Sequence, residues 1–487
     1  MIDKCMENNK IVGRQKERAL MEALILSDKP ELVAIYGRRR VGKTFLVKQH
    51  FVDRMTFCFS GTYQASRSTQ LALFAREINT QFNIDVDIPK DWFSAFDLLR
   101  IALENNISEK KIVFIDELPW LDTPKSNFIQ AFSFFWNTWG STQSDLKLFV
   151  CGSATTWMLD KLIGDKGGLY GRVTRQIYLS PFSLRETELF LSEVKQIFWD
   201  RMQILNVYMV LGGIPYYLNM IDKQLSLESN IDQLFFAKGA PLRSEFNFLY
   251  RSLFGDKSMA KQVVIALSEK LKGLTREELC ARLKIKQNGN LSECLNNLVH
   301  CDFLRVYNSF GKGVKGQMYQ LCDMFSLFYL RFVDENSGQD EQYWSNCSKT
   351  GSISVWSGYA YEQVALLHLL QIKKKLGISG VLTNSCSWSV KPFVDVDGGS
   401  WNGAQIDLTI DRNDSFVNLC EIKYSKDEYV ITKEYDMILR ERMSCFKHVT
   451  KTRKSLLNTF ITIFGVKRNN YSGIVDSEII LDDLFVD

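Results

Sequence analysis

The chain of 487 residues lacks the sequence features of three common classes of protein. Its eleven cysteines form no Cys-x-x-Cys pair and no His/Cys cluster at zinc spacing, which disfavours a zinc module. No apolar run reaches the ~18 to 20 residues that cross a bilayer. The run at 207–221 is broken by Gly212, Gly213 and Pro215. Because no signal peptide is found either, we expect free thiols in a reducing cytoplasm and no membrane span.

Length and composition describe a multidomain globular protein. The length predicts roughly three domains. Hydrophobic residues make up 46% and charged residues 24% of the chain, which is ordinary for a globular protein. The formal charge of +4 is small, so it does not by itself imply a polyanionic partner. Contact with nucleic acid would need a local concentration of positive charge.

The segment GRRRVGKT at 37–44 directly follows the apolar run 32–36 and has the form of a phosphate-binding loop. Gly37 and Gly42 stand where the backbone must curl around an anion, Lys43 reaches the outer phosphates, and the Thr44 hydroxyl holds Mg²⁺. The helix predicted after the loop presents its N-terminal amides and dipole to the phosphates. The expected ATP contacts are Gly37, Arg38, Arg39, Arg40, Val41, Gly42, Lys43, Thr44 and Phe45.

The three arginines of this loop occupy positions that the generic pattern leaves free. They either touch phosphate, touch a partner domain, or are solvated, and the sequence does not decide among these.

Two further apolar strands complete the predicted nucleotide site. The run 111–117 ends in Asp116, a ligand for Mg²⁺, and Glu117, which polarises the attacking water. The run 148–151 leads into Ser153, which either senses the γ-phosphate or caps a helix beginning near Thr155. Such strands alternating with helical stretches predict a parallel sheet with helices on both faces.

Five ordered motifs resemble the archaeal-type ATPases, a branch of the AAA+ and STAND-like P-loop proteins. They are GRRRVGKT, FIDELPWL at 114–121, CGSATTWM at 151–158, GLYGRVTRQIYLSPFS at 168–183 and LGGIPYYL at 211–218. The resemblance implies ATP hydrolysis and an arginine, Arg172 or Arg175, that approaches the nucleotide of its own or a neighbouring subunit. Each is otherwise a surface arginine paired with a carboxylate. The segment 213–215 resembles the Gly-Pro element that couples nucleotide to a helical lid, although a simple turn between helices would look the same.

The middle of the chain has the order of a winged helix. Helical stretches at 259–270, 275–283 and 291–299 precede strands at 303–307 and 317–321. Between 257 and 331, twelve Lys/Arg stand against six Asp/Glu, a local balance of +6. This balance is compatible with DNA binding, with the third helix in the major groove. A packing or protein-interaction module is an equal alternative. The expected phosphate contacts are Lys284, Lys286, Lys312 and Lys315.

The C-terminal part carries a second constellation. Asp407 lies on the predicted strand 405–410 opposite the apolar face, and Glu421 and Lys423 share one face of the next strand. The pattern resembles the PD-(D/E)xK nuclease fold. The resemblance implies that Asp407 and Glu421 hold Mg²⁺ or Mn²⁺ beside Lys423, which acts on the attacking water. Glu362, on an upstream helix, offers a third carboxylate.

The resemblance also implies a tyrosine or glutamine on the following helix. Tyr435 is the candidate for that position. The alternative is an inactive relic in which Glu421 and Lys423 form an ion pair.

The predicted fold class is α/β: a P-loop NTPase parallel sheet (1–185) with a helical lid (186–255), a winged helix (256–333) and an α/β nuclease-like domain (350–487). We expect an ATPase whose nucleotide state controls DNA binding and metal-dependent cleavage. It would act alone or as a homo-oligomer. The alternative function is an ATP-dependent signalling or assembly switch with an inactive C-terminal sensor or binding domain.

Overall fold

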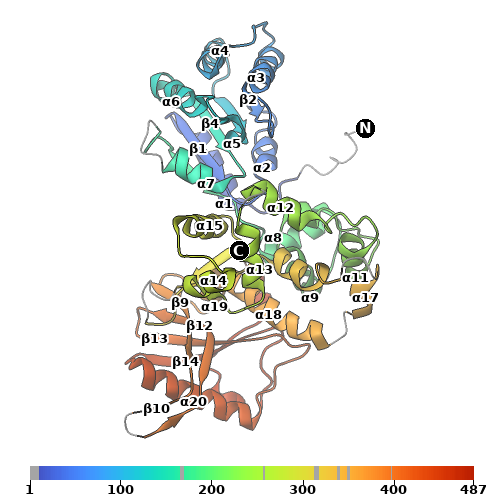
Figure 1. Ribbon diagram of the computed structural model, residues 1–487, viewed down its shortest axis with the longest axis vertical. Helices are drawn as coiled ribbons and strands as arrows, with labels where there is room; N and C mark the ends of the chain where they lie inside the picture. Colours follow the sequence, from blue (N-terminus) through green and yellow to red (C-terminus); the bar gives the residue numbers. More distant parts are fainter. Residues whose placement is uncertain are drawn as a thin grey trace. The chain divides into compact units, whose positions relative to one another are not determined.

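The computed structural model describes residues 10–164, 169–255, 258–311, 317–336, 340–347, 351–395 and 398–486. These residues divide into two compact units, one of Met1–Pro181 with Ile214–Asn219 and one of Phe182–Gly213 with Met220–Asp487 (Figure 1). Lys312 and Lys315, two of the expected phosphate contacts, lie outside the described residues. Within the described part, no helix is long and apolar enough to cross a membrane.

A five-stranded sheet forms the centre of the first unit, in the order β2-β3-β4-β1-β5. All pairings in it are parallel, as predicted. Its strands are β1 (Glu31–Tyr36), β2 (Met55–Ser60), β3 (Lys111–Asp116), β4 (Leu146–Cys151) and β5 (Arg175–Tyr178). All residues of β3 and β4 are buried, which is the pattern of strands covered on both faces.

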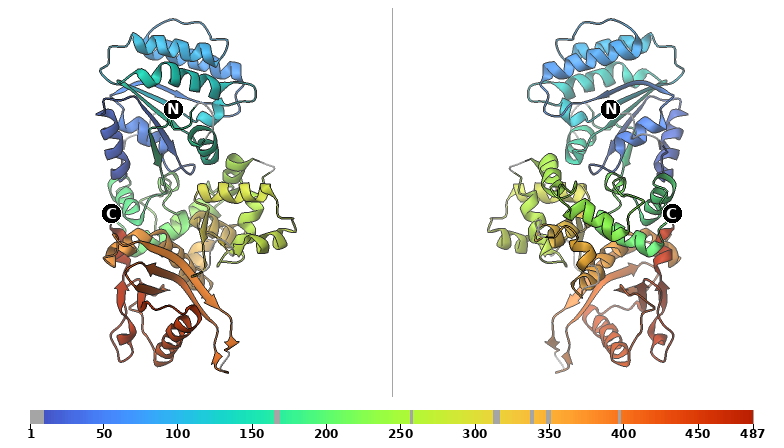
Figure 2. Two further views of the ribbon diagram at one scale, coloured as in Figure 1. Left: turned by 90° about the vertical axis from the view of Figure 1, so that its left-hand side faces the viewer. Right: turned by 90° about the vertical axis from the view of Figure 1, so that its right-hand side faces the viewer.

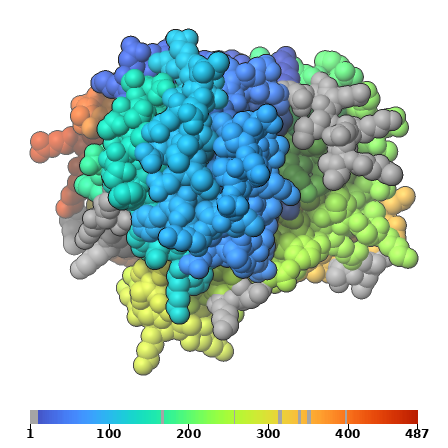
Figure 3. All heavy atoms as spheres, turned by 90° about the horizontal axis from the view of Figure 1, so that it is seen from above, coloured from blue at the N-terminus to red at the C-terminus, as the bar shows by residue number. Residues whose placement is uncertain are grey.

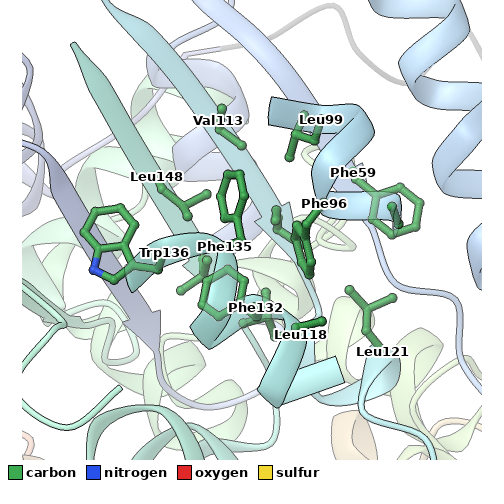
Figure 4. Close-up of a cluster of buried hydrophobic side chains, with 14 of the residues drawn as sticks. Phe59, Phe96, Leu99, Val113, Leu118, Leu121, Phe132, Phe135, Trp136 and Leu148 are labelled. Atoms are coloured by element: carbon green, nitrogen blue, oxygen red, sulfur yellow. The ribbon is translucent and has the colours of Figure 1, made fainter. Parts of the chain in front are cut away.

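Helices cover both faces of this sheet (Figure 2). On one face, α3, α4 and α6 bring a phenylalanine-rich core onto the strands, in which the Phe96 and Phe135 rings stack with centroids 5.2 Å apart (Figure 4). On the other face, Phe51, which follows α2, packs on Phe149 of β4 with ring centroids 4.9 Å apart. Figure 3 shows the outer surface of the α3–α4 layer. The helices of this unit are α1 (Gln15–Ile25), α2 (Lys43–His50), α3 (Arg67–Phe82), α4 (Trp92–Glu104), α5 (Leu118–Leu121), α6 (Phe128–Thr138), α7 (Thr155–Trp157) and α10 (Pro215–Leu218).

The second unit begins with a helical region. It contains α8 (Leu184–Leu189), α9 (Arg201–Leu211), α11 (Leu227–Ile231), α12 (Glu245–Phe254), α16 (Met324–Phe328), α17 (Tyr343–Cys347), α18 (Gly351–Leu367) and α19 (Leu369–Lys375). Between α12 and α16 lie α13 (Ala260–Ser268), α14 (Arg276–Leu283) and α15 (Gly289–His300), followed by β7 (Leu304–Tyr307) and β8 (Met318–Leu321). This is the predicted order of elements. A short strand that the sequence reading omitted, β6 (Leu274–Thr275), pairs with β8 and gives the sheet order β6-β8-β7.

A mixed sheet in the order β15-β14-β13-β12-β9 forms the C-terminal part of the second unit. Its strands are β9 (Thr383–Val390), β12 (Ala404–Arg412), β13 (Phe416–Lys423), β14 (Ser455–Thr462) and β15 (Ser477–Ile479), beside a small hairpin of β10 (Phe393–Val394) and β11 (Ser400–Trp401). β12 is antiparallel to both β9 and β13, whereas β14 is parallel to β13 and is reached through α20 (Lys433–Thr450). Phe446 of α20 packs on Trp388 of β9 with ring centroids 5.0 Å apart.

A buried histidine joins the start of the second unit to α18. His368 is 2% exposed, its Nε2 accepts a hydrogen bond from the Leu184 backbone N–H at 3.0 Å, and its Nδ1 donates to the Val364 carbonyl at 2.7 Å. Burial lowers the pKa of His368 to about 4. The ring is therefore neutral in the folded protein across the physiological pH range.

We predict an acid-sensitive contribution of His368 to the free energy of unfolding. The unfolded chain binds a proton at this ring below its ordinary pKa of about 6.5, whereas the folded chain does so only near pH 4. The contribution is thus fully present above pH 6.5 and is lost as the pH falls towards 4. Denaturant unfolding between pH 7 and pH 4 should show a shallower pH dependence for His368→Gln than for the wild type. His300→Gln removes an exposed histidine of the same unit as a control, and equal slopes for the two variants would contradict the prediction.

Candidate functional site

The phosphate loop connects the end of β1 to the start of α2. Gly37 and Gly42 have φ of 139° and 92°, values that strain any residue with a side chain. A Cβ at Gly37 would stand 2.3 Å from the Leu179 carbonyl oxygen, whereas a Cβ at Gly42 would meet nothing within 4 Å. The loop therefore needs glycine at the first position for packing, and it leaves an open cradle at the second, as a phosphate requires.

Lys43 lies inside this loop. Its side chain is buried, and Nζ donates to the carbonyl oxygens of Gly37 and Arg38 at 2.9 Å each. A buried ammonium among carbonyl oxygens is positioned to act on an anion held by the same loop.

Thr44 and Asp116 meet although they are 72 residues apart in the sequence. The Thr44 hydroxyl donates to Asp116 Oδ2 at 2.7 Å, and Asp116, the last residue of β3, is 3% exposed. A hydroxyl and a carboxylate are hard oxygen donors of the kind that Mg²⁺ takes together with phosphate oxygens. The two residues predicted to hold Mg²⁺ are thus side by side and fit that ion.

Glu117 and Ser153 form a second pair beside this site. Both the backbone N–H and the hydroxyl of Ser153 donate to Glu117 Oε2, at 3.0 and 2.9 Å. Burial raises the pKa of Glu117, although the bonds from Ser153 oppose the shift. Helix α7 begins without a side-chain cap, so the Ser153 hydroxyl serves Glu117 instead of the helix. Glu117 also has a left-handed backbone, with φ of 49°, at the turn out of β3.

The three loop arginines have different surroundings. Arg38 is 2% exposed. Arg40 lies over the ring of Tyr216, with its guanidinium carbon 4.2 Å from the centroid. Tyr216 follows Ile214 and Pro215 in the segment predicted to couple nucleotide to a lid, and this segment belongs to the first unit. Arg40 therefore links the phosphate loop to that segment through a cation–π contact.

Arg14 is a loop contact that sequence reasoning missed. It is buried, and its Nη2 donates to the Ser180 carbonyl at 2.7 Å and reaches the Val41 carbonyl at 3.5 Å. It thereby fixes the phosphate loop from outside. Its only sequence signal is an arginine after Gly13 and before a predicted helix, which is too common to identify it.

Arg172 and Arg175 lie at the start of β5 and are exposed. Arg175 pairs with Val33, near the beginning of β1, whereas the phosphate loop follows the end of that strand. At roughly 3.3 Å per residue, this places the start of β5 on the order of 13 Å from Gly37. The backbone of Arg175 thus lies towards the opposite end of β1 from the phosphate loop, and Arg172 precedes it by three residues.

A cavity of about 340 Å³ lies in the second unit between the β7–β8 hairpin and the C-terminal sheet. Glu362 of α18 and Asp407 of β12 both line it. The register between β12 and β9 shifts between Ile406 and Thr409, which is a β-bulge at Asp407. The bulge interrupts the strict alternation predicted for this strand, because Leu408 and Thr409 are both buried. Bulges commonly redirect a side chain at a functional site.

Glu362 and Asp407 interact electrostatically. Burial raises the pKa of Glu362 to about 8, the neighbouring Asp407 carboxylate adds to the shift, and Arg305 opposes it. Glu362 is therefore largely protonated at neutral pH in the absence of a bound cation.

Glu421 has a different environment and does not line the cavity. It accepts hydrogen bonds from Tyr435 Oη and Lys423 Nζ, at 2.6 Å each, and from Arg442. Burial disfavours its charge, but Lys423 and Arg442 together outweigh burial and hold the pKa of Glu421 below its usual range. Tyr435, the candidate on the following helix, does contact Glu421, whereas Arg442 belongs to no motif and was missed.

The three predicted carboxylate ligands thus lie in two environments, because Glu362 and Asp407 line the cavity and Glu421 does not. Within the described ranges, no group of three His, Cys, Asp or Glu side chains is placed to hold a metal ion. Glu362 and Asp407 line the same cavity, and carboxylates are ligands that Mg²⁺ takes together with substrate phosphate. Glu421 does not fit as a third ligand while it neutralises two cations.

Comparison with known proteins identifies the N-terminal part. Residues 11–221 match the family model described as an ATPase domain predominantly from Archaea. An uncharacterized protein of Methanocaldococcus jannaschii, MJECL04, is 25% identical over 419 residues, which are 85% of this chain and 87% of that protein.

Two solved structures are among those to which the chain is similar. The Walker-type ATPase PABY2304 of Pyrococcus abyssi is 18% identical, with a TM-score of 0.47 over 66% of this chain and 96% of that one. The ORC2 protein of Aeropyrum pernix is 12% identical, with a TM-score of 0.44 over 68% and 96%. Residues 11–221 are thus similar to that ATPase domain, and Lys43, Thr44 and Asp116 have the geometry of a phosphate-binding nucleotide site.

Proposed function

We propose that the chain hydrolyses ATP at the phosphate loop and that its nucleotide state controls DNA binding and phosphodiester cleavage by the second unit. The observation that carries the proposal is the 2.7 Å bond between Thr44 and Asp116, beside a lysine buried within the loop. It joins the two nucleotide motifs of the sequence into one site.

Each residue of the ATP site has a distinct task in this proposal. Mg²⁺, when bound, neutralises charge on the phosphates. Thr44 and Asp116 hold it, Lys43 contacts the outer phosphates, and Glu117 accepts a hydrogen bond from the attacking water. Ser153, which already donates twice to Glu117, fixes the direction of that carboxylate.

A cation that stabilises the developing charge has to come from elsewhere, because Arg172 and Arg175 lie at the far end of the sheet. We assign Arg172 to the site of a neighbouring copy, so hydrolysis would require a homo-oligomer.

In the second unit, Glu362 and Asp407 would hold Mg²⁺ or Mn²⁺ against a DNA phosphate. Lys423 would orient the attacking water, and Glu421 would keep Lys423 in place through its ion pair instead of binding metal. Lys284 and Lys286, both exposed, are available for phosphates of the same DNA.

A specific observation favours a second candidate function. The carboxylate of Glu421 is satisfied by two cations and a phenol, which is the environment of a structural ion pair. In that case the protein is an ATP-dependent switch whose C-terminal domain binds or senses without cutting.

We predict that Lys43→Ala abolishes nucleotide binding, because it removes the ammonium that the Gly37 and Arg38 carbonyls hold inside the phosphate loop. Glu117→Gln should instead retain ATP binding and lower the hydrolysis rate by about 10² or more, the usual contribution of a general base. Titration with a fluorescent ATP analogue and a phosphate-release assay measure the two effects. Lys48→Ala, an exposed position on α2, is the matched control. Hydrolysis at the wild-type rate by Glu117→Gln would remove Glu117 from the mechanism.

We predict that Asp407→Asn abolishes the nicking of labelled plasmid in Mg²⁺ or Mn²⁺, with or without ATP, because it removes one of two cavity carboxylates. Asn402→Ala changes an exposed residue nearby as a control. If the wild type hydrolyses ATP but cuts no nucleic acid offered, cleavage is wrong and the switch function stands.

A further inference from the structure

The cavity beside Asp407 is built from two separate parts of the second unit. Glu362, Asp407 and Ser385 come from α18 and the C-terminal sheet, whereas Arg305 and Tyr307 come from β7 and Lys272 from the turn before β6. The two parts are joined by a bridge between Ser309 and Ser387, where Phe310 N–H donates to the Ser387 carbonyl at 2.8 Å.

The charged residues that line the cavity carry more positive than negative charge. Lys270, Lys272 and Arg305 stand against Glu362 and Asp407, which is three cations against two carboxylates even with both acids ionised. Lys270 is paired at 2.7 Å with Glu278, which does not line the cavity, so Lys272 and Arg305 are the cations that an entering anion would contact.

Arg305 is held in a fixed direction. Its Nη2 donates to the side-chain oxygens of Gln320 and, at 3.3 Å, Gln363, and Gln320 is itself anchored to the Leu271 carbonyl at 2.7 Å. Its Nη1 is buried and makes no hydrogen bond to any described residue. The Ser385 hydroxyl, on the facing wall, is also buried and has no partner among the described residues. The Arg305 guanidinium and the Ser385 hydroxyl thus keep unused hydrogen-bonding capacity in the wall of this cavity.

The size of the cavity limits what the ligand can be. Proteins read duplex DNA with helices or strands that protrude into its grooves, whereas this cavity is a recess that is partly open to solvent. Chemistry on a nucleotide inside a pocket requires an unpaired or extruded nucleotide. A cavity of about 340 Å³ lies near the lower limit of small-molecule sites, which is the scale of one nucleotide. Tyr307, whose ring lies 5.8 Å from the guanidinium carbon of Arg305, supplies an aromatic face next to the phosphate donors.

We propose that this cavity binds one unpaired nucleotide of single-stranded DNA, with its phosphate on Arg305 and Lys272 and its base on Tyr307. The module predicted to read duplex DNA thereby contributes the substrate-binding wall of the C-terminal site. The inference rests on the proposed function only in taking DNA as the ligand, and it concerns binding without cleavage.

Fluorescence anisotropy in EDTA tests the inference, because chelation prevents metal-dependent cutting. The probes are a short labelled single strand and the blunt duplex of the same sequence. The wild type should bind the single strand more tightly. Arg305→Ala should weaken that binding about tenfold, as expected for a lost charge-assisted hydrogen bond. It should also make the negative slope of log K against log salt shallower by about 0.7. Arg305→Lys, which keeps the charge, should retain most of the affinity.

Matched variants separate the cavity from general charge. Arg282→Ala removes an exposed cation of the same module that does not line the cavity, and it should leave single-strand binding nearly unchanged. Tyr307→Phe should retain binding and Tyr307→Ala should lose about tenfold. Asp407→Asn should tighten binding, because it removes negative charge from the cavity.

Either of two outcomes would overturn the inference: equal affinity for single strand and duplex, or equal effects of Arg305→Ala and Arg282→Ala. Loss of nicking with intact single-strand binding would count against cleavage alone and would leave the cavity assignment standing.

Discussion

The parallel pairing of β1 with β4, and of β4 with β3, is the constraint on which the ATP site depends. Ile35 pairs with Cys151 and Ile115 with Val150, so three strands end at one edge of the sheet. The phosphate loop, Ser153 and the Asp116–Glu117 pair follow those ends directly. Because the strands are buried on both faces, a slip in register would expose apolar residues and separate the site at the same time.

The sequence signals for this part of the site are local. A loop of glycines between an apolar strand and a helix, and an acid at the end of another apolar strand, each require only neighbouring residues to be recognised. Arg14 and the contact of Arg40 with Tyr216 escaped, because their partners lie 166 and 176 residues away and no short pattern records them. No sequence signal indicates that Ser153 bonds to Glu117, because that contact depends on the folded sheet.

The C-terminal part was predicted less completely for two physical reasons. Alternation gives the face of a strand residue only while the ladder is regular, and the bulge at Asp407 depends on the register with β9. The environment of Glu421 depends on Arg442, which reaches it from a helix 21 residues later. An E-x-K pattern cannot distinguish a carboxylate that binds metal from one that is already neutralised. Removing one partner from such a buried network would leave an uncompensated charge and would destabilise the junction of β13 and α20.

The interleaving of the two units has a consequence for synthesis on the ribosome. Residues 182–213 are made before 214–219, yet the former belong to the second unit and the latter to the first. The last segment of the first unit is therefore translated early. The hydrogen-bond acceptor of the Leu184 backbone amide is His368, which is translated 154 residues after Ile214. At roughly 5–20 residues per second, that interval is on the order of 10 to 30 s. During this time α8 and α9 have no partners from α16 and α18, so a nascent chain with a finished nucleotide site still exposes apolar helices that a chaperone could recognise.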